Sequence, residues 1–437
     1  MDLSSPHGAS VDDGIAPELC SLSYISVDMI ADRVAALGRG TLLAKMDVQE
    51  AYRIVPVHHD DMHLLGMSWK DEWYIDATLP FGIRSAPMIF SAIADALEWI
   101  LYQEGVSWLA HYIDDIITMG PAKSDECAKN KHIILSVGEV LGFLFHKCDG
   151  PTPCLTFLGI EVDSEAMELR LPLDKLANLR SLIKEWLGRK ACTKLQIESL
   201  IGHLNHACKV VHPGRTFLGR LINLLRGSKA RRPRDFVRLN QEARSDLQWW
   251  GSFLPLWNGI SMLRPRRRQE PDHEIWSDAS GSWGCGAFWG SSWFHFQWPT
   301  ELQPELIATK ELIVVAASVW GSKWAGKMIR CNCDNQAAVA VINSGHSKDP
   351  SLMHLLRCLF FISAHFDCSL TAVHIAGKLN TLADALSRDN LPLFSSLAPQ
   401  ADRDPVPIPN HLVQVLTVER PDWTSRSEWF VSTFTTR

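Results

Sequence analysis

The sequence predicts an α+β protein built from several domains, and three observations carry that prediction. Runs of β-type residues alternate with amphipathic helix over residues 1–165, apolar residues recur at helical spacing over 166–255, and strands and helices alternate again over 274–390. A Pro- and Arg-rich linker at 256–273 separates the last two regions, and a Pro-rich segment follows at 391–437. The length of 437 residues agrees with about three domains.

The composition is that of an ordinary globular protein. Hydrophobic residues make up 46% of the chain and charged residues 21%, which argues against a disordered tract. No apolar run approaches the ~20 residues of a membrane span, and polar residues follow Met1 where a signal peptide would be apolar. The 11 cysteines, an odd number at irregular spacing, indicate a reducing compartment. We therefore expect an intracellular protein, cytoplasmic or nuclear, without membrane contact.

The charge of the chain is unevenly distributed. The formal net charge is -6, yet residues 209–238 carry nine Lys or Arg residues against the single acid Asp235. The basic residues alternate with apolar ones in what we interpret as helix, which would pack on one side and present guanidinium groups to phosphates on the other. Arg231 and Arg232 are the candidates for such backbone contacts. A shorter basic run at 264–268 fits a solvated linker equally well.

The first candidate catalytic stretch is 111–117, where Asp114 and Asp115 interrupt an apolar β-type run. A tight hairpin turn at this point would expose both side chains. Two adjacent carboxylates cannot both stay ionised in a dry site without a cation, and Mg²⁺ prefers one or two carboxylates together with substrate phosphates. An exposed Asp-Asp turn is the alternative interpretation of the pair taken alone.

Five short motifs follow one another along the chain, at residues 43–52, 79–87, 112–115, 142–147 and 157–160. The first is a β-type run that contains Asp47, the second is a Gly- and Pro-punctuated loop ahead of an amphipathic helix, and the third holds the Asp pair. In this order they resemble the palm motifs of reverse transcriptases: the first catalytic Asp, the template–primer loop, the YxDD box and the next two motifs, of which the second is the primer grip. The resemblance implies a palm, an antiparallel sheet with helices, within residues 1–165.

The resemblance implies a polymerase site with two metal ions about 4 Å apart, a spacing used for in-line phosphoryl displacement. Asp47 and Asp114 would be the principal metal ligands, with Asp115 as the third carboxylate. The ions would be Mg²⁺, with Mn²⁺ as the alternative. Lys147 would protonate the leaving pyrophosphate.

The resemblance also assigns substrate-binding residues. Tyr52 fits a steric gate that selects deoxynucleotides, although a core aromatic residue would satisfy the same pattern. Phe81 and Gly82 would line the nascent base pair, with Gly82 allowing the backbone to approach closely. Reverse transcriptases carry a fingers segment ahead of the first motif, and we expect that segment to be truncated in residues 1–40.

Residues 166–255 are expected to form a helical thumb or connection domain. Apolar residues recur there at 3.6-residue spacing, over 173–187 and again over 195–204. Such a domain would clamp the template–primer through contacts to the nucleic-acid backbone alone. The residue types that bind zinc also occur there, at His203, His206, Cys208 and His212. Their spacing lacks a second well-separated pair, so we favour packing on a helix face over a zinc site.

Acidic residues occupy the ends of predicted elements over residues 274–390, at Asp278, Glu311, Asp334 and Asp384. Asp278 ends a predicted strand, Asp334 follows another strand and precedes a helix, and the other two lie on predicted helices. Each acid alone would be a helix cap or a surface group, but the ordered set closely resembles the α/β ribonuclease H domain of retroelements. The resemblance implies that the four carboxylates hold two Mg²⁺ ions that activate water against an RNA phosphodiester.

The C-terminal segment 391–437 is rich in proline and weakly periodic, so we expect a flexible extension. Residues 421–423 within it resemble the start of the recombinase of DIRS-like retrotransposons, and the stretches at 2–5 and 202–218 fit the same family. We therefore expect the reverse transcriptase and ribonuclease H region of a DIRS-like polyprotein. The catalytic residues of the recombinase do not occur in the sequence, so no recombination is expected.

The expected function is RNA-directed DNA synthesis together with hydrolysis of RNA in the resulting hybrid. The implied partners are an RNA template, a DNA primer, the RNA–DNA hybrid and deoxynucleoside triphosphates. Two alternatives stay open. One is a polymerase-inactive chain that acts as a ribonuclease H with the palm as a substrate clamp, and the other is a nucleic-acid-binding protein without catalysis.

Overall fold

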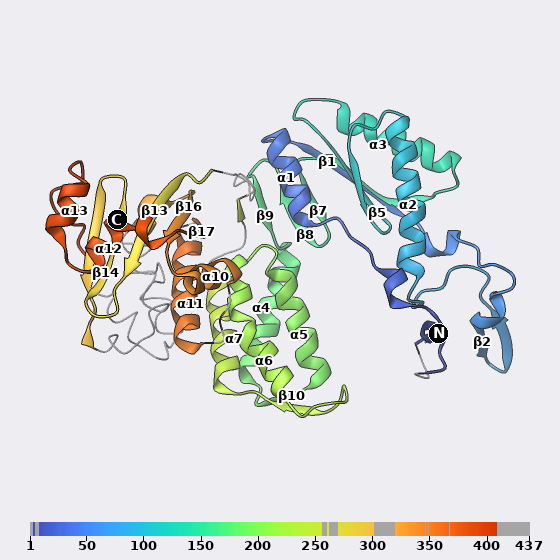
Figure 1. Cartoon of the computed structure of the whole chain (residues 1–437). Coiled ribbons are helices and arrows are strands. Elements are labelled where there is room, and N and C mark those ends of the chain that lie inside the picture. The colour runs from blue at the N-terminus through green and yellow to red at the C-terminus, as the bar shows by residue number, and fades with distance from the viewer. Residues whose placement is uncertain are drawn as a thin grey trace. The chain divides into compact units, whose positions relative to one another are not determined.

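The computed structural model describes residues 3–4, 8–255, 260–261, 270–300, 320–345, 347, 349–366 and 368–408 (Figure 1). The chain divides into two compact units. The first comprises the described residues up to Pro172 together with Ile260 and Ser261, and the second comprises the other described residues from Leu173 onward. Across the described part of the chain, no helix combines the length and the apolar character that crossing a membrane requires. Most of the predicted linker at 256–273 lies outside the described residues.

The first unit is built on a four-stranded antiparallel sheet in the order β4-β5-β1-β6. Its strands are β1 (Leu42–Val48), β4 (Leu109–Tyr112), β5 (Asp115–Gly120) and β6 (Phe145–Thr152). The helices of this unit are α1 (Val27–Leu37), α2 (Ala86–Gln103) and α3 (Glu126–Val140). In β1, Met46 and Val48 are buried, and Asp47 between them points to the opposite face because side chains alternate along a strand.

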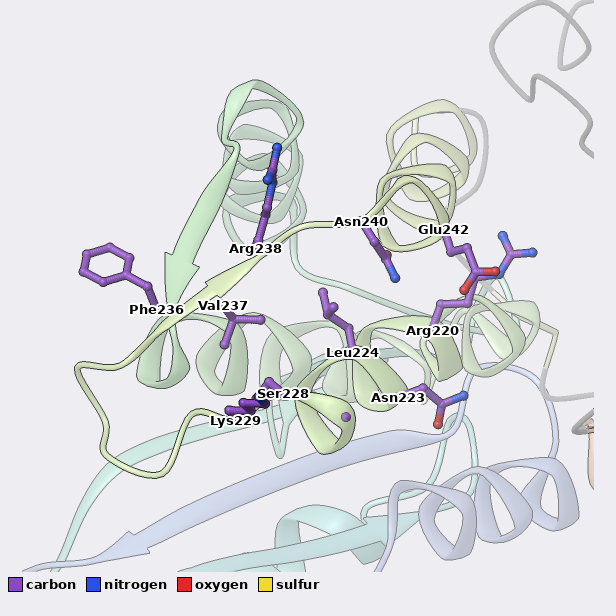
Figure 2. A pocket seen from close by; sticks show the side chains of 11 residues that line it. Arg220, Asn223, Leu224, Ser228, Lys229, Phe236, Val237, Arg238, Asn240 and Glu242 are labelled. Carbon is purple, nitrogen blue, oxygen red and sulfur yellow. The ribbon is translucent and has the colours of Figure 1, made fainter.

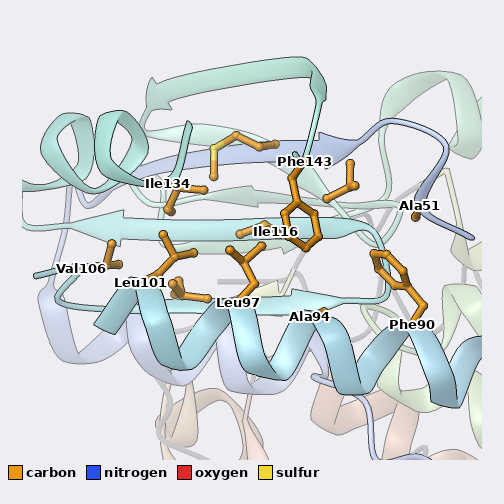
Figure 3. Packing of buried hydrophobic residues seen from close by; sticks show 12 residues of the cluster. Ala51, Phe90, Ala94, Leu97, Leu101, Val106, Ile116, Ile134 and Phe143 are labelled. Atoms are coloured by element: carbon orange, nitrogen blue, oxygen red, sulfur yellow. The ribbon is translucent and has the colours of Figure 1, made fainter. Parts of the chain in front are cut away.

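An apolar core fills the space between this sheet and helices α2 and α3 (Figure 3). Phe90, Ala94, Leu97 and Leu101 lie three or four residues apart, so they form one stripe along α2. That stripe belongs to the same buried cluster as Ile116 of β5. One face of the sheet is therefore closed by packing, which leaves the opposite face for polar side chains.

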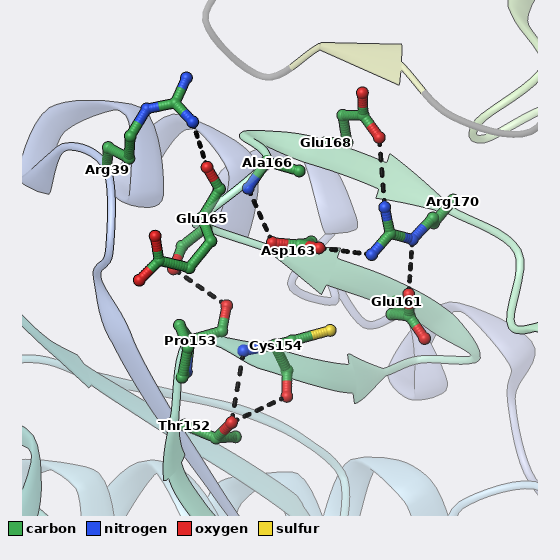
Figure 4. A network of polar contacts seen from close by, with 11 residues as sticks. Arg39, Thr152, Pro153, Cys154, Glu161, Asp163, Glu165, Ala166, Glu168 and Arg170 are labelled. Carbon is green, nitrogen blue, oxygen red and sulfur yellow. Dashed lines mark hydrogen bonds and ion pairs between the residues drawn. The ribbon is translucent and has the colours of Figure 1, made fainter.

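Two smaller sheets complete the first unit. Strands β7 (Cys154–Phe157), β8 (Ile160–Asp163), β9 (Glu168–Arg170) and β12 (Ile260–Ser261) form a sheet in the order β12-β9-β8-β7. The Arg170 guanidinium pairs with the carboxylates of Glu161, Asp163 and Glu168, which ties β8 to β9 (Figure 4). Strands β2 (Gly66–Trp69) and β3 (Glu72–Ile75) form a separate hairpin. Short 3₁₀ helices lie at Val11–Gly14, Pro17–Cys20, Ala51–Ile54 and Met62–Leu65.

The second unit begins with helices, as its apolar spacing predicts. They are α4 (Leu173–Gly188), α5 (Lys194–Ala207), α6 (Gly219–Gly227) and α7 (Gln241–Phe253), with a 3₁₀ helix at His212–Phe217. The helical pattern did not predict the two short strands between them. Strands β10 (Ala191–Thr193) and β11 (Phe236–Arg238) pair antiparallel as a two-stranded ribbon. Three-residue strands are too short to show a period-2 pattern, and their pairing joins residues far apart in sequence.

The remainder of the second unit is a five-stranded mixed sheet in the order β15-β14-β13-β16-β17. Its strands are β13 (His273–Ala279), β14 (Gly284–Trp289), β15 (Ser292–Gln297), β16 (Met328–Cys333) and β17 (Ser369–His374). Strand β13 pairs antiparallel with β14 and parallel with β16. The helices described here are α10 (Gln336–Ser344), α11 (Pro350–His365), α12 (Thr381–Ser387) and α13 (Leu391–Leu397), with 3₁₀ helices at Gly321–Trp324 and Gly377–Leu379.

The first part of the C-terminal segment is structured, which differs from the flexible extension expected for 391–437. Phe394 of α13 is buried against Trp293, with ring centroids 5.0 Å apart. The Trp293 indole nitrogen donates to the Asp402 carbonyl at 2.7 Å, and the Val406 backbone nitrogen donates to the Trp293 carbonyl at 2.8 Å. Aromatic packing on β15 therefore holds this part of the segment, whereas residues 409–437 lie outside the described residues.

A buried ion cluster joins helices α6 and α7 of the second unit to its helix α11. Asp246 of α7 is 1% exposed and lies 3.4 Å from Arg357 of α11, which is 4% exposed, and 3.4 Å from the partly exposed Arg220 of α6. Burial raises the pKa of Asp246 to about 6 against the opposing charges of the two arginines. Such a cluster is costly to break, because the remaining charge would stay buried without its partner.

Candidate active sites

The first candidate site lies on the polar face of the first unit's sheet. Asp47 of β1 and Asp115 of β5 are Cα partners, so they stand directly opposite each other on the same face. Strands β4 and β5 leave Ile113 and Asp114 between them as a two-residue turn, with Ile113 in the left-handed region at φ 55°. The Asp114 carbonyl accepts a 2.9 Å hydrogen bond from the Val48 backbone nitrogen. The hairpin therefore brings the three predicted residues to the same end of β1.

The carboxylates of this site disfavour one another's charge. Burial raises the pKa of Asp114, and the charge of Asp47 raises it further. Burial also raises the pKa of Asp115, with the charges of Asp114 and Asp47 acting in the same direction. A divalent cation would offset this repulsion, and carboxylate oxygens are the ligands that Mg²⁺ prefers. The chemistry of this donor set therefore fits the predicted metal site.

A lysine and a histidine stand beside Asp47. The Lys147 ammonium lies 3.3 Å and the His146 Nε2 atom 3.6 Å from the Asp47 Oδ2 atom. Strand β6 positions both, because His146 is the Cα partner of Asp47. Lys147 is thus placed at Asp47, where its ammonium would compete with a bound metal ion for the same oxygen. Its side chain is 70% exposed, so it can also turn toward a substrate.

The three acids of the first site are not grouped at a shared ligand distance among the described residues. Among the described residues, the group whose ligand atoms all lie within 4.8 Å of one another is His58, His59 and Asp60, an exposed set on a loop of the first unit. The three catalytic candidates do not meet that distance.

The predicted substrate-binding aromatic residues lie next to these acids. The Tyr52 ring is 5.1 Å from the Phe81 ring and 5.9 Å from the Phe90 ring, measured between centroids. Burial raises the Tyr52 pKa, and the charge of Asp114 adds to that effect. Tyr52 therefore packs on the core, as its core interpretation predicts, and also stands near the carboxylates, while its role as a steric gate stays a prediction. Gly82 has a φ of 94°, a left-handed conformation that glycine adopts without steric cost.

A hollow beside Phe81 contains functional candidates that sequence reasoning missed. It has a volume of about 390 Å³, and Glu50, Arg53 and Asp76 line it. The Arg53 guanidinium donates to both Asp76 carboxylate oxygens, at 2.8 and 2.7 Å, and this pairing lowers the Asp76 pKa. No sequence motif marked Arg53, although it directly follows Tyr52. Phe81 lines the hollow and its ring packs against that of Tyr52, so the hollow lies close to the predicted steric gate.

The second candidate site lies at one edge of the mixed sheet. Asp278 is near the end of β13 and Asp334 follows β16, and because these strands are parallel neighbours the two acids share an edge. Asp384 of α12 is the third member. Burial raises the pKa of Asp278 to about 6. The charges of Asp334 and Asp384 also raise this pKa, whereas a hydrogen bond from the Ser387 hydroxyl lowers it. Three of the four predicted acids therefore interact electrostatically.

Helix α12 reaches this edge because a glycine lies beneath it. A Cβ atom on Gly286 of β14 would come within 2.2 Å of the Leu386 Cβ atom and 2.9 Å of the Leu386 carbonyl carbon. The Asn380 amide also donates to the Ser277 carbonyl at 3.0 Å, which fixes the start of the helix against β13. Neither Gly286 nor Ser387 stood out in the sequence, because each acts through a neighbour that is distant along the chain.

Several predicted residues are left unplaced. Glu311 lies outside the described residues, so its position relative to Asp278 stays a prediction. The zinc interpretation of 203–212 receives no support from the described side chains, since His203, His206 and Cys208 do not form a group at ligand distance. Burial raises the pKa of Cys208 to about 12, which fits a thiol packed in a core. The side chain of His212 is not described.

Arg231 and Arg232 lie on an exposed loop, where the sequence pattern suggested helix. The Asp235 carboxylate explains this difference, because it accepts hydrogen bonds from the backbone nitrogens of Arg231 and Arg232 at 2.7 and 2.8 Å. An aspartate that bonds to backbone donors in this way stabilises a turn in competition with helix. Both guanidinium groups remain at the surface.

No family model matches the chain. Among curated proteins, Polyprotein P3 of Commelina yellow mottle virus is 22% identical in an alignment of 381 residues that covers 81% of this chain. The chain spans 18% of the length of that polyprotein. It is therefore similar, over most of its length, to one region of a much longer viral protein.

The solved structures that are similar to the chain include foamy viral protease–reverse transcriptases. One form bound to double-stranded DNA is 13% identical, with a TM-score of 0.47 over 81% of this chain and 60% of that chain. Another, bound to an RNA/DNA hybrid, is 13% identical with a TM-score of 0.44 over 80% and 46%. A third, bound to double-stranded DNA, is 14% identical with a TM-score of 0.45 over 81% and 71%.

Proposed function

We propose that this chain is a reverse transcriptase-like enzyme with two phosphoryl-transfer sites. The first would perform RNA-directed DNA synthesis, and the second would cleave RNA in an RNA–DNA hybrid. The observation that carries the proposal is the placement of Asp47 directly opposite Asp115, with Asp114 in the adjoining turn. Three carboxylates at one strand end are costly unless a cation is shared among them.

In the first site, Asp47, Asp114 and Asp115 would hold Mg²⁺, with Mn²⁺ as the alternative. A pair of such ions, when bound, lowers the pKa of the attacking hydroxyl and stabilises the leaving group. The Tyr52 ring would exclude a ribose 2′-hydroxyl and so select deoxynucleoside triphosphates. Lys147, whose ammonium stands 3.3 Å from Asp47, would donate a proton to the leaving pyrophosphate.

In the second site, Asp278, Asp334 and Asp384 would hold the same kind of ion, with Glu311 as the fourth expected ligand. Asp278 is the least exposed of the three, at 6%, and its raised pKa supports a role in binding a cation. The Arg388 Nε atom donates to the Asp384 Oδ1 atom at 2.6 Å, and we propose that its guanidinium would be available to a phosphate bound beside Asp384. The substrate would be an RNA–DNA hybrid.

Two assays on the same preparation test both activities. We expect primer extension on poly(rA)/oligo(dT) and cleavage of a labelled RNA–DNA hybrid, each dependent on Mg²⁺. Asp114→Asn should lower extension more than about a hundredfold and leave cleavage intact, and Asp278→Asn should do the reverse, because even outer-shell groups contribute ~10–100-fold at metal sites. If either substitution leaves its own activity unchanged, that site assignment is wrong. Salt-sensitive binding without either activity would instead indicate a nucleic-acid-binding protein.

We propose further that the chain belongs to a DIRS-like retrotransposon polyprotein. The sequence similarity at 421–423, 2–5 and 202–218 supports this origin, and the first of these stretches lies outside the described residues. The genomic sequence around the coding region tests it. A downstream frame with the catalytic residues of a tyrosine recombinase would support the proposal, and an integrase of another class would refute it.

A further inference from the structure

The ribbon formed by β10 and β11 has one buried and one exposed face. Cys192 and Val237 are Cα partners and are 1% and 3% exposed, so they close the inner face. Phe236 and Arg238 flank Val237 on β11 and therefore point outward. Phe236 is 78% exposed, and Figure 2 shows its ring projecting from the end of the strand, away from the helices. An aromatic ring and a guanidinium thus share one solvent-facing surface.

The loop that leads into β11 adds further cations to this surface. Lys229, Arg231, Arg232 and Arg234 are all exposed. Their one acidic neighbour, Asp235, accepts hydrogen bonds from loop backbone nitrogens, and across the described residues no carboxylate pairs with these four side chains. The loop is also held in place, because the Lys194 nitrogen donates to the Asp235 carbonyl at 2.8 Å and the Leu195 nitrogen to the Pro233 carbonyl at 3.0 Å.

A hollow of about 470 Å³ lies between this ribbon, α6 and the start of α7 (Figure 2). Its basic lining residues are Arg220, Lys229 and Arg238, its acidic one is Glu242, and Asn223 and Asn240 add amide groups. Phe236 stands at the outer end of the same hollow. The volume suits one nucleotide unit better than a duplex, because single-ligand pockets span roughly 300–1,000 Å³.

We propose that this surface binds an unpaired nucleotide of a single-stranded extension, with its base stacked on Phe236 and its phosphates at Arg238 and Lys229. The proposal rests on the proposed function and adds to it a contact for the strand outside the duplex. Stacking on Phe236 requires a base whose flat face is uncovered, and within a duplex the neighbouring base pairs cover both faces of each base. Exposed aromatic rings beside unpaired cations are the usual elements of single-strand binding, whereas an apolar protein partner would not need this density of positive charge.

Fluorescence anisotropy with the full chain tests the proposal. The probes are a blunt RNA–DNA hybrid and the same hybrid extended by a short oligo(dT) or oligo(U) overhang. We expect the hybrid with the overhang to bind more tightly than the blunt hybrid. Phe236→Ala should weaken the affinity for the extended hybrid by at least about fivefold, the size expected for one lost base–aromatic stack. Phe236→Trp should restore the preference. Because stacking is uncharged, the loss should be similar at low and high salt.

Two control variants separate stacking and site-specific charge from general effects. Leu173→Ala removes another exposed apolar side chain, 80% exposed, outside the hollow. Arg226→Ala removes one positive charge near the hollow without removing a lining residue, so Arg238→Ala should weaken overhang binding more than Arg226→Ala does. Equal losses for the two arginine variants would overturn the phosphate assignment.

The outcomes separate this proposal from the proposed function. If the unaltered chain binds blunt and extended hybrids equally, or if Phe236→Ala keeps the full overhang preference, the ribbon site is refuted while extension and cleavage still test the two metal sites. If both activities are absent but the overhang preference depends on Phe236, the proposed function fails and the ribbon site stands as a single-strand contact. A difference between oligo(dT) and oligo(U) identifies which strand the ribbon receives.

Discussion

Replacing Ser387 by alanine should change how hybrid cleavage depends on pH. The buried Ser387 hydroxyl donates a hydrogen bond to the Asp278 Oδ2 atom, and this bond lowers a pKa that burial has raised to about 6. A hydrogen bond to a charged group contributes ~1.5–3 kcal/mol, and one pKa unit corresponds to ~1.4 kcal/mol, so losing the bond should raise the Asp278 pKa by about one unit or more.

The direction of the effect follows from proton competition. Mg²⁺ binds the ionised carboxylate, so protonation of Asp278 weakens metal affinity as the pH falls through the pKa. At about pH 6 the ionised fraction should fall from roughly one half to roughly one tenth in Ser387→Ala, whereas at about pH 8 both forms are almost fully ionised. The apparent Mg²⁺ affinity should therefore drop about fivefold at the lower pH and hardly change at the higher one.

The assay is hybrid cleavage measured against Mg²⁺ concentration at both pH values. Ser363→Ala is the matched control, because Ser363 is a buried serine of the same unit whose hydroxyl donates to the Cys368 carbonyl and not to an acid. An equal loss of affinity at both pH values would refute the argument, since it would show that Ser387 positions Asp278 without tuning its ionisation.

Three further expectations concern the second unit. Gly286→Ala should abolish cleavage and spare primer extension, because the new Cβ atom would collide at 2.2 Å with Leu386 and displace α12. Unchanged cleavage would show that the packing of α12 on Gly286 is not needed for this activity. Arg231→Ala combined with Arg232→Ala should weaken binding roughly equally across sequences and flatten the salt slope by about one for each lost phosphate contact; a loss confined to particular sequences would contradict a backbone role. Arg357→Ala should lower the free energy of unfolding in urea by about 3 kcal/mol, because it leaves a buried carboxylate with one partly exposed partner, and a loss below about 1 kcal/mol would contradict the buried ion pair.

The order of neighbouring residues in the sequence was enough to predict individual strands and turns of the first unit. The β-type run around Asp47 predicted a strand, and the structure places this run in β1, with Met46 and Val48 in the core and Asp47 on the other face. The interruption of an apolar run by Asp114 and Asp115 likewise predicted a hairpin turn, and the structure places a two-residue turn there. The expected exposure of both side chains was wrong, because Asp115 is the first residue of β5 and both acids are half-buried. The relevant spacing is two residues in each case, so neighbouring positions carry the information.

Contacts between distant segments could not be predicted in the same way. Gly286 and Ser387 matter because α12 packs on β14, and nothing in either segment specifies that partner. The β10–β11 ribbon pairs Ala191 with Arg238, and neither three-residue strand shows a period of its own. The expected helix around Arg231 was wrong because Asp235 stabilises a turn through backbone donors. A single sequence offers propensities, whereas these features depend on tertiary partners.

The conformation of Ile113 has a consequence for how firmly the first site is held. A β-branched residue at a positive φ is unfavourable, at a cost of ~1–3 kcal/mol, and glycine or asparagine would suit the position better. Ile113 nevertheless packs its side chain against the core cluster, and that burial offsets the backbone cost. The side chain of Ile113 thus anchors the turn to the core, next to the residue Asp114 that carries a candidate metal ligand.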